Sequence, residues 1–497
     1  MFPDYLLQII KTLQAAGFEA YAVGGCVRDS LMQRIPNDWD VTTNARPEQV
    51  QALFPTAVYE NLFGTVLVKV QNEDGVTEDV VEVTTYRSEK GYSDHRRPDE
   101  VNFETELDKD LERRDFTINA MALMPVPESG GMELGEFRSI VEVGGEPAVL
   151  VDLFGGQKDI KKRVIRAVGE PEWRFKEDAL RMMRAVRFAC QLGFDIEPKT
   201  ERNIAKLAPS IRFVANERIK DELVKILSAP DPAFGIRKMK DLNLLHYIIP
   251  ELDAGSGVQQ SRHHIHDVFE HNLLSLKHCP NQQWQVRLAA LFHDIAKPQT
   301  RKIIDGIATF YNHEYTGAKL TRKIMTRLKF PTADIDRVTN LVKNHMFYYM
   351  VDEVTAASVR RLIAKTGREN LQDLIDLRVA DRLGSGTPKA MPYKLRHLQY
   401  MMEKVQNDPV SVKMLAINGD NLINDLHIEP GPKFGCLLDC LLAEVLEDPR
   451  HNTRDHLLVR AEELMKEDLE TLRAQARSLI EEKREEEDKA IKKNYKV

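Results

Sequence analysis

Apolar residues along the first 125 positions alternate between helical and strand-like spacing. An amphipathic pattern over residues 3–16 predicts a helix. Short apolar runs predict strands at residues 20–23, 40–42, 65–70 and 79–85. A Gly-Gly pair directly after the first run predicts a turn that opens a second helix. Together these elements indicate a small mixed sheet with helices on one side.

The pattern changes to mostly helical after this region. We expect a hairpin around Gly155 and Gly156, followed by helices up to about residue 250. Long amphipathic helices containing His and Asp cover residues 258–383, and further helices cover residues 395–470. Residues 481–493 are charged and have almost no apolar face, which is typical of a solvated or frayed helix. The predicted fold class is α+β, with a small mixed-sheet head followed by a mostly α-helical body.

Length and composition narrow the picture. A chain of 497 residues with 42% apolar and 30% charged residues is expected to form several packed units. No stretch of eighteen apolar residues occurs, so we expect no membrane span, and the N-terminus lacks the features of a signal peptide. Five cysteines without a Cys-x-x-Cys pair indicate reduced thiols and a cytoplasmic protein. The net charge of −7 leaves RNA binding open, since Lys and Arg can gather on one face.

The most specific chemistry lies between residues 21 and 43. Gly24 and Gly25 follow a predicted strand and open a helix, so the backbone there can approach a phosphate. Arg28 lies one turn into that helix, within reach of phosphate oxygens. Asp38 and Asp40 are two positions apart on a strand-like segment, which directs both carboxylates to one face. Either motif alone is usually an ordinary turn or loop, but their combination in this order favours a Mg²⁺ and nucleotide site.

This stretch resembles the Gly-Gly-x-Val-Arg-Asp and Asp-x-Asp motifs of the class II tRNA nucleotidyltransferases, relatives of poly(A) polymerase in the polymerase beta superfamily. The resemblance implies that Asp38 and Asp40 hold the catalytic Mg²⁺. It also implies nucleotide contacts from Gly24, Gly25 and Arg28. Glu82 matches the supporting third carboxylate of the superfamily, although a charge on the open face of a strand explains it equally well.

A second segment of the resemblance is RRDFTINAMAL, at residues 113–123. On spacing alone this segment is compatible with the first turn of a helix, with Asp115 near its cap. In the family the motif contacts the sugar and the triphosphate. The resemblance therefore implies nucleotide binding by Arg114, Asp115 and Asn119.

A third segment, at residues 174–194, carries Asp178, Arg181, Arg184 and Arg187 at intervals of three, so neighbouring members share one side of a helix. Periodicity alone favours simple i,i+3 salt bridges. Cytosine and adenine, however, both present an amino donor beside a ring-nitrogen acceptor, which one Asp–Arg pair can read. The family's Glu-Asp-x-x-Arg motif falls here, which implies base selection by Asp178 and Arg181 and phosphate or base contacts from Arg184 and Arg187.

Residues 86–112 are rich in charge and poor in apolar periodicity, which predicts a mobile loop. In the family, enzymes that add the terminal A have such a loop, whereas enzymes that add only CC have a shorter one. The loop therefore favours full CCA addition. This sequence has Arg97 where the family commonly has His.

A histidine-rich region at residues 262–381 resembles the HD phosphohydrolase superfamily. A single His on an apolar helix is usually a core residue, but here several positions match in order. The resemblance implies divalent-metal ligands at His271, His293, Asp294, His313, His345 and Asp381. Imidazole and carboxylate ligands suit Mn, Ni, Co or Mg. The resemblance leaves open whether this domain has phosphohydrolase activity on RNA ends.

Residues 415–452 resemble the tail that supports the tRNA elbow in the same family. The implied domains are a head (1–150), a neck (151–255), an HD domain (256–390) and a tail (391–497). The implied activity is template-independent addition of CCA to tRNA from CTP and ATP, with no membrane and no obligate protein partner. Two alternatives stay open: a poly(A) polymerase or A-only adding enzyme, and an HD phosphohydrolase with an RNA-binding head.

Overall fold

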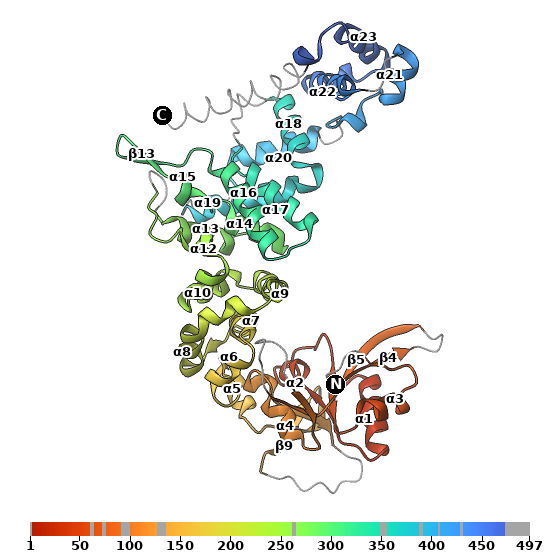
Figure 1. The fold of residues 1–497 in the computed structure, drawn as a ribbon, viewed down its shortest axis with the longest axis vertical. Coiled ribbons are helices and arrows are strands. Elements are labelled where there is room, and N and C mark those ends of the chain that lie inside the picture. Colours follow the sequence, from red (N-terminus) through yellow and green to blue (C-terminus); the bar gives the residue numbers. More distant parts are fainter. Residues whose placement is uncertain are drawn as a thin grey trace. The chain divides into compact units, whose positions relative to one another are not determined.

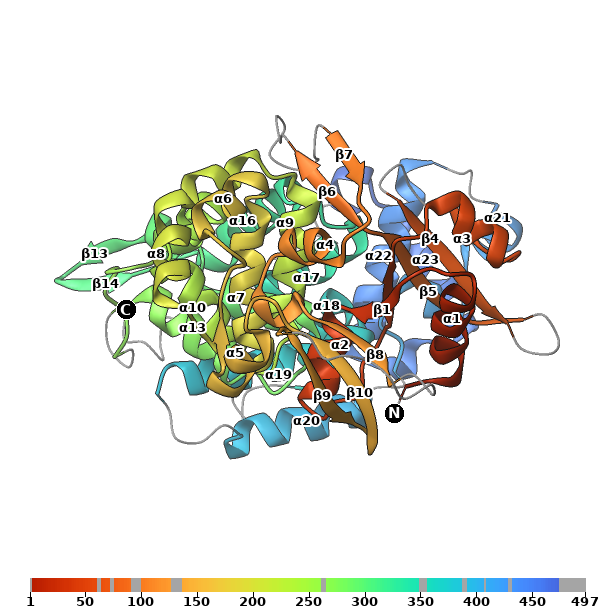
Figure 2. The same cartoon turned by 90° about the horizontal axis from the view of Figure 1, so that it is seen from below.

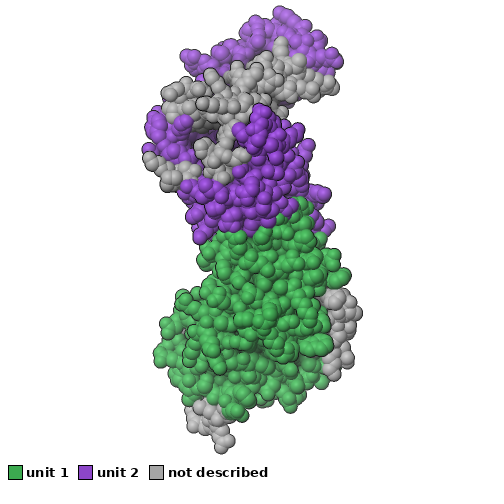
Figure 3. Space-filling model, turned by 90° about the vertical axis from the view of Figure 1, so that its left-hand side faces the viewer, with its two compact units in different colours: residues 1–253 green, residues 254–497 purple. Residues whose placement is uncertain are grey.

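The computed structural model describes residues 2–59, 64–71, 76–90, 100–126, 136–260, 265–347, 355–386, 391–405, 408–427 and 431–472. The chain divides into two compact units, Met1–Asp253 and Ala254–Val497, which are coloured separately in Figure 3. Among the described residues, every helix is too short or too polar to cross a membrane.

The first unit contains an eight-stranded sheet (Figure 1). Its strands follow the order β3 (Val58–Tyr59), β4 (Thr65–Gln71), β5 (Thr77–Thr85), β2 (Asp40–Thr43), β1 (Ala20–Val23), β8 (Ala122–Pro125), β10 (Glu146–Val151) and β9 (Arg138–Val143). Strands β2 and β5 are parallel, whereas the other neighbouring pairs are antiparallel. The sheet is therefore mixed, which confirms the predicted α+β class.

Helices cover both faces of this sheet. All four residues of β1 are buried, and because side chains alternate between the faces of a strand, both faces must be covered. Ala20 and Ala22 share a core with α1 (Asp4–Ala15). Tyr21 and Val23 belong to a second core, which contains Leu107 and Leu111 of α4 (Leu107–Glu112). The expectation of helices on one side only is wrong because the charged sequence around α4 conceals its two apolar anchors.

The hairpin expected around Gly155 and Gly156 is also wrong. Gly155 adopts a left-handed conformation with φ 75° and begins α5 (Gly156–Lys162). The hairpin instead joins β9 to β10 through Gly144 and Gly145, whose φ angles are 60° and 87°. A two-residue turn with positive φ at both positions matches the twist of the flanking strands and favours glycine.

The predicted loop at residues 86–112 is partly regular structure. Strand β6 (Arg87–Lys90) pairs antiparallel with β7 (Glu100–Phe103), and α4 follows, as Figure 2 shows. Residues 91–99, which include Arg97, lie outside the described residues. Paired backbones satisfy each other's hydrogen bonds without an apolar face, so the charge pattern concealed these strands.

The remainder of the first unit is helical, as predicted. Its helices are α5, α6 (Pro171–Glu177), α7 (Leu180–Leu192), α8 (Pro198–Leu207), η2 (Ala208–Phe213), α9 (Asn216–Leu227), α10 (Pro232–Asp241), α11 (Leu244–Ile248) and α12 (Pro250–Asp253). Two short parallel strands, β11 (Val164–Ile165) and β12 (Asp195–Ile196), lie between them. Helix α7 is amphipathic and packs on α9 and α10, which leaves its arginines near the head.

The second unit is almost entirely helical. Its first part comprises α13 (Val268–Lys277), α14 (Trp284–Phe292), α15 (Lys297–Thr300), the hairpin β13 (Lys302–Ile304) and β14 (Ile307–Thr309), α16 (His313–Arg327), α17 (Thr332–Asn344), α18 (Ala356–Thr366), η3 (Arg368–Asn370), α19 (Leu371–Gly384) and α20 (Tyr393–Val405). The tail comprises η4 (Val412–Met414), α21 (Gly419–Leu426), α22 (Pro432–Glu447), η5 (Pro449–His451) and α23 (Arg454–Leu464). The predicted helix at residues 481–493 lies outside the described residues.

Candidate active sites

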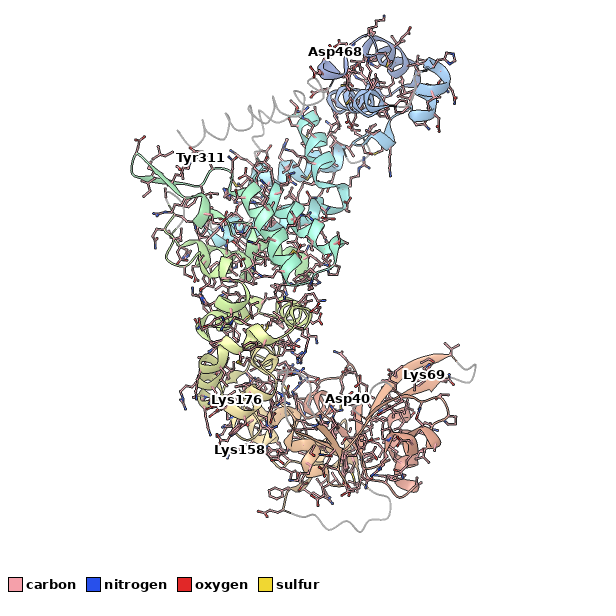
Figure 4. The ribbon with its side chains drawn as sticks, in the orientation of Figure 1. Asp40, Lys69, Lys158, Lys176, Tyr311 and Asp468 are labelled. Atoms are coloured by element: carbon pink, nitrogen blue, oxygen red, sulfur yellow. The ribbon has the colours of Figure 1, made fainter. Side chains whose placement is uncertain are left out.

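Three carboxylates approach one another at the centre of the head sheet. Asp40 is the first residue of β2; it is paired with Val23 on β1 and with Glu82 on β5 (Figure 4 labels Asp40). Asp38 lies in a bend before the strand, so the prediction that both aspartates share a strand is wrong. Its charge nevertheless reaches Asp40, as the pKa of that group shows.

The pKa of the Asp40 carboxyl is raised to about 6. Burial is the main cause, and the like charges of Glu82 and Asp38 add to it, while Arg114 opposes the shift. Neighbouring carboxylates repel one another, and a divalent cation between them would relieve that repulsion. The carboxylates of the head therefore fit a divalent metal.

A glycine turn lies directly beside these carboxylates. Gly24 has φ 83° and precedes α2 (Gly25–Leu31), which confirms the predicted order of strand, Gly-Gly turn and helix. A Cβ atom on Gly24 would lie 3.2 Å from Nη1 of Arg114 and 3.7 Å from Oδ2 of Asp40. Because Gly24 has no side chain, the Arg114 guanidinium and the Asp40 carboxylate can both lie close to the backbone of the turn.

Arg114 is held in place by Asp110, which sequence reasoning missed. Asp110 is fully buried, and its two oxygens accept from Nη2 of Arg113 at 2.6 Å and from Nη2 of Arg114 at 3.1 Å. Burial favours the neutral acid, but the charges of both arginines lower the pKa of Asp110 below its usual value. The i,i+3 and i,i+4 spacing to the arginines was the available signal. It was overlooked because Asp110 falls in the predicted loop.

A hydrogen-bond network joins the head to α7. Asp115 accepts from the backbone N–H of Phe116 at 2.8 Å, from Nδ2 of Asn119 at 3.2 Å and from Nε of Arg184 at 2.7 Å. Oδ1 of Asn119 in turn accepts from Nη1 of Arg28 at 2.9 Å. The structure therefore brings four of the predicted nucleotide-binding residues together.

The electrostatics of this network favour an ionised Asp115. Burial alone would raise the pKa of its carboxyl, but the charges of Arg184 and Arg181 lower it. The helical turn expected after Asp115 is present as a single 3-10 turn, η1 (Thr117–Asn119). Arg28 is also paired with Asp29 at 2.8 Å and is 8% exposed, so its guanidinium is held in place by protein partners.

Asp178 does not belong to the helix that carries the three arginines. It ends α6 with an extended backbone, and its Oδ1 accepts from the N–H of Leu180 at the start of α7. Its ion-pair partner is Arg218 on α9, at 2.7 Å, whereas Arg181 pairs with Glu177 at 2.6 Å. The single helical row predicted for Asp178 and the arginines is therefore wrong at its first member.

Arg187 lies inside the first unit. Its guanidinium is 3.1 Å from the carboxylate of Glu222 on α9 and 4.1 Å from the centre of the Phe188 ring. Burial, followed by the charge of Arg184, lowers its pKa to about 10. Glu222 interrupts the apolar stripe formed by Ile219 and Leu223, which is a sequence signal for a buried ion pair. The arrangement ties α7 to α9.

Six predicted ligands converge in the second unit. They come from five helices or helix ends: α13, α14, α16, α17 and α19. They form two sets of three, and within each set the ligand atoms lie within 4.8 Å of one another. The first set is His271, His293 and Asp381, and the second is Asp294, His313 and His345. Donor sets of imidazole and carboxylate at this spacing fit divalent metals.

Asp294 links the two sets. Its Oδ2 lies 3.2 Å from Nε2 of both His271 and His293, and its Oδ1 lies 3.2 Å from Nε2 of His313. Lys297 approaches the same carboxylate to 2.5 Å, and Arg378 holds Asp381 at 2.7 Å. Burial alone would raise the pKa of Asp294, but the charges of Lys297 and His293 lower it far below the usual range.

The imidazoles are oriented by the backbone. Nδ1 of His293, His313 and His345 lies 2.8, 2.8 and 2.7 Å from the carbonyl oxygens of Ala290, Phe310 and Val342. Donation from each Nδ1–H orients the ring and turns its Nε2 toward the carboxylate of Asp294. Nε2 of His271 lies 3.0 Å from Nε2 of His293. Metal sites commonly orient their histidines in this way.

Models of three protein families match the chain. The Poly A polymerase head domain matches residues 20–166, and the probable RNA and SrmB-binding site of polymerase A matches residues 193–255. The HD domain matches residues 273–385. The first match spans the carboxylates and the glycine turn, and the third spans most of the histidine cluster.

Relatives and solved structures cover nearly the whole chain. An A-adding tRNA nucleotidyltransferase of Deinococcus radiodurans is 35% identical over 85% of this chain and 90% of its own. A CCA-adding enzyme of Lactiplantibacillus plantarum is 33% identical over 90% and 93%. The structure of the Bacillus stearothermophilus CCA-adding enzyme in complex with CTP has a TM-score of 0.66 and 26% identity, covering 94% of this chain and 100% of its own. The chain belongs to the tRNA nucleotidyltransferase family that includes the CCA-adding enzymes.

Proposed function

We propose that this chain adds CCA to the 3′ end of tRNA, using CTP and ATP. The observation that carries the proposal is the position of Asp40, which is paired with Glu82 on β5, feels the charge of Asp38, and lies beside the Gly24 turn and Arg114. Such a site combines a place for a cation with donors for a triphosphate. Relatives that share nearly the whole chain are named CCA-adding enzymes, which supports the same reaction.

We propose Mg²⁺ as the metal of the head, held by Asp38 and Asp40 with Glu82 in support. When bound, Mg²⁺ lowers the cost of forming the attacking 3′-oxygen anion and of releasing pyrophosphate. The chain supplies the remaining interactions. Gly24 lets the backbone approach the triphosphate closely, and Arg114, fixed by Asp110, offers a positive charge beside it.

Asp178 and Arg181 remain our proposal for base selection. In this structure Arg218 pairs with Asp178 at 2.7 Å and Glu177 pairs with Arg181 at 2.6 Å. Facing one base together, the carboxylate and the guanidinium would match the amino group and ring nitrogen that cytosine and adenine share. Guanine and uracil present the reverse order of donor and acceptor, so the same pair rejects GTP and UTP.

The nucleotides themselves provide the test. A tRNA that lacks CCA is incubated with CTP alone, with ATP alone and with both, and the products are resolved by length. CCA addition predicts two residues from CTP alone and three from the mixture. An A-adding enzyme, like the Deinococcus relative by name, would add nothing from CTP. A poly(A) polymerase would extend the RNA with ATP alone.

The histidine cluster supports a second candidate function. We propose that it binds a divalent metal, Mn, Ni, Co or Mg, and hydrolyses phosphate esters at damaged RNA ends. Six buried or nearly buried ligands with backbone-fixed imidazoles support a metal centre rather than an ordinary core. Hydrolysis of 3′-phosphate and 2′,3′-cyclic phosphate ends is measured with each metal in turn. Activity that persists in Asp40→Asn would belong to this second centre, and no release of phosphate with any metal would contradict the proposal.

We propose four domains: a nucleotidyltransferase head (1–150), a neck (151–255), an HD domain (256–390) and a tail (391–497). The family matches at residues 20–166, 193–255 and 273–385 support the first three. A cytoplasmic location is part of the same proposal, because bacterial tRNA is made and matured in the cytoplasm. Limited proteolysis at the proposed boundaries, followed by mass spectrometry, would test the division.

A further inference from the structure

The tail contains a third cluster of metal-binding side chains, which neither proposed reaction uses. Glu444 lies on α22, His451 ends η5 and His456 lies in the first turn of α23. One ligand atom from each lies within 4.8 Å of the other two. Three elements that follow one another along the chain therefore direct a carboxylate and two imidazoles to one place.

The spacing of the three ligand atoms suits a small divalent ion. Oε1 of Glu444 lies 2.8 Å from Nε2 of His456 and 3.7 Å from Nδ1 of His451. A tetrahedral zinc with bonds of about 2.0–2.1 Å separates its ligands by about 3.3 Å. These two distances are about half an ångström or less from the value that the ion would impose, and the shorter one is a hydrogen bond that the ion would replace.

One nitrogen of the cluster is unsatisfied. Nδ1 of His451 is inaccessible to solvent and has no hydrogen-bond partner among the described residues. The His451 and His456 rings stack at 4.5 Å between their centres with an angle of 17°. Buried polar atoms without partners are rare in folded proteins, and a bound ion can satisfy such an atom.

The surroundings favour a cation over an anion. Nε of Arg460 donates to Oε2 of Glu444 at 2.9 Å, which orients the carboxylate and leaves Oε1 toward the histidines. Arg460 also forms an ion pair with Glu463, with 2.6 Å between Nη1 and Oε2. Two carboxylates and one guanidinium give this group a net charge of −1 while both imidazoles are neutral, so a phosphate would be repelled.

Two of the ligands, Glu444 and His451, also border a cavity of about 380 Å³, whose lining includes Arg460. The ligand side chains are between 26% and 41% exposed, so the ion would be reached from solvent. Three protein ligands and an accessible fourth position are a common arrangement for zinc.

We propose that Glu444, His451 and His456 bind Zn²⁺ and that the ion ties η5 and α23 to α22. The donor set is two imidazoles and one carboxylate without a thiolate, which zinc accepts. The carboxylate held by Arg460 is an outer-shell contact of the kind that orients metal ligands. The site is separate from the six ligands of the histidine cluster, and its role is to stabilise the tail.

Counting bound zinc tests the proposal. The full-length protein is stripped with chelator, dialysed against Zn²⁺, and the metal per chain is measured for the wild type, His451→Gln and His456→Gln. Each variant should bind one Zn²⁺ fewer than the wild type. His278→Gln is the matched control, because His278 is exposed at the end of α13 and should leave the count unchanged. Equal counts in all four proteins would overturn the proposal.

Amide hydrogen exchange shows where in the chain zinc binding acts, and it also detects a variant that is misfolded. In the wild type, Zn²⁺ should slow amide exchange over residues 444–456, since the ion would restrain all three elements. In His451→Gln this slowing should be lost, while exchange in the zinc-free protein should match the wild type, because His451 Nδ1 has no hydrogen bond to lose among the described residues. Exchange in the wild type that does not respond to saturating Zn²⁺ would contradict the inference.

Discussion

The head and the histidine cluster both gather metal-binding side chains, but they balance charge in opposite ways. In the head, burial and then the charges of Glu82 and Asp38 raise the pKa of Asp40, while the charge of Arg114 opposes the shift. In the histidine cluster, Asp294 is surrounded by imidazoles and Lys297, and its pKa is lowered far below the usual range. The carboxylates of the head therefore repel one another, whereas the Asp294 carboxylate of the cluster lies among groups that attract it.

This difference indicates how each site acquires its metal. Repelling carboxylates gain most from a cation that arrives with a charged substrate, as in the complex of Mg²⁺ with a nucleoside triphosphate that we propose for the head. Imidazoles whose tautomers are fixed by backbone carbonyls are organised before any metal binds. A resident metal is the expected occupant of the second site. Substituting one aspartate in the head and one in the histidine cluster tests this difference in charge balance.

Asp40→Asn should have the largest effect on activity. Loss of a metal-binding carboxylate removes several kcal/mol of transition-state stabilisation, so nucleotide incorporation should fall about 10³-fold. The same change removes a like charge, so the metal-free protein should melt at the same or a higher temperature. Incorporation assays and thermal melts measure the two effects. Asp108→Asn, at an exposed position on α4, is the control.

Asp294→Asn should have the opposite effect on stability. It leaves Lys297 buried without the carboxylate that approaches it to 2.5 Å, and breaking a buried pair costs about 3 kcal/mol or more. Chemical denaturation of the metal-free protein measures this loss, while CCA addition should be retained. Asp336→Asn, which removes half of an exposed surface pair, should change little. Equal destabilisation by both substitutions would refute the contrast between the two centres.

Comparing Gly24→Ala with Gly17→Ala distinguishes steric crowding at the head site from backbone strain. Gly24 and Gly17 both have positive φ, at 83° and 86°, so alanine is strained at either position. Only at Gly24 would the new Cβ meet Arg114 and Asp40, whereas at Gly17 nothing lies within 4 Å. We expect about tenfold lower kcat/KM for Gly24→Ala, or about 1.4 kcal/mol, and near-normal activity for Gly17→Ala. Similar activity in both variants would show that the turn does not approach the nucleotide.

The smallest effect should be a shift of the pH profile when a neighbouring charge is removed. Because Asp40 has a pKa of about 6 and binds a metal only when ionised, kcat/KM should rise about tenfold per pH unit below pH 6 and level off above it. The raised pKa also means that the stability contributed by protonated Asp40 is present below about pH 4 and is lost as the pH rises through 6. Removing a like charge in Asp38→Asn should move the midpoint to lower pH, and an unmoved midpoint would assign it to another group.

Local patterns predicted the elements that carry the head site. The strand at residues 20–23, the Gly-Gly turn and the helix after it form as expected because each follows from local backbone preferences. The charged segment at residues 86–112 resembles a loop in sequence, since neither β6 nor α4 has a regular apolar period. The break at Asp178 was missed because its i,i+3 spacing to the arginines imitates a continuous helix.

Partners distant in sequence could not be predicted. Arg218 pairs with Asp178 across 40 residues, and Glu222 pairs with Arg187 across 35. Such pairs follow from how α9 packs on α7, which no local pattern encodes. The sequence was sufficient to predict the six His and Asp ligands from their order along the chain. That Asp294 joins the two ligand sets could be seen only in the three-dimensional structure.

The network from Arg28 through Asn119 and Asp115 to Arg184 crosses from the head to α7. A side chain that changes length or charge at one of these positions leaves a buried neighbour without its partner. Engineering a new nucleotide preference on α7 would accordingly require compensating replacements on the head, at residues that never touch the base.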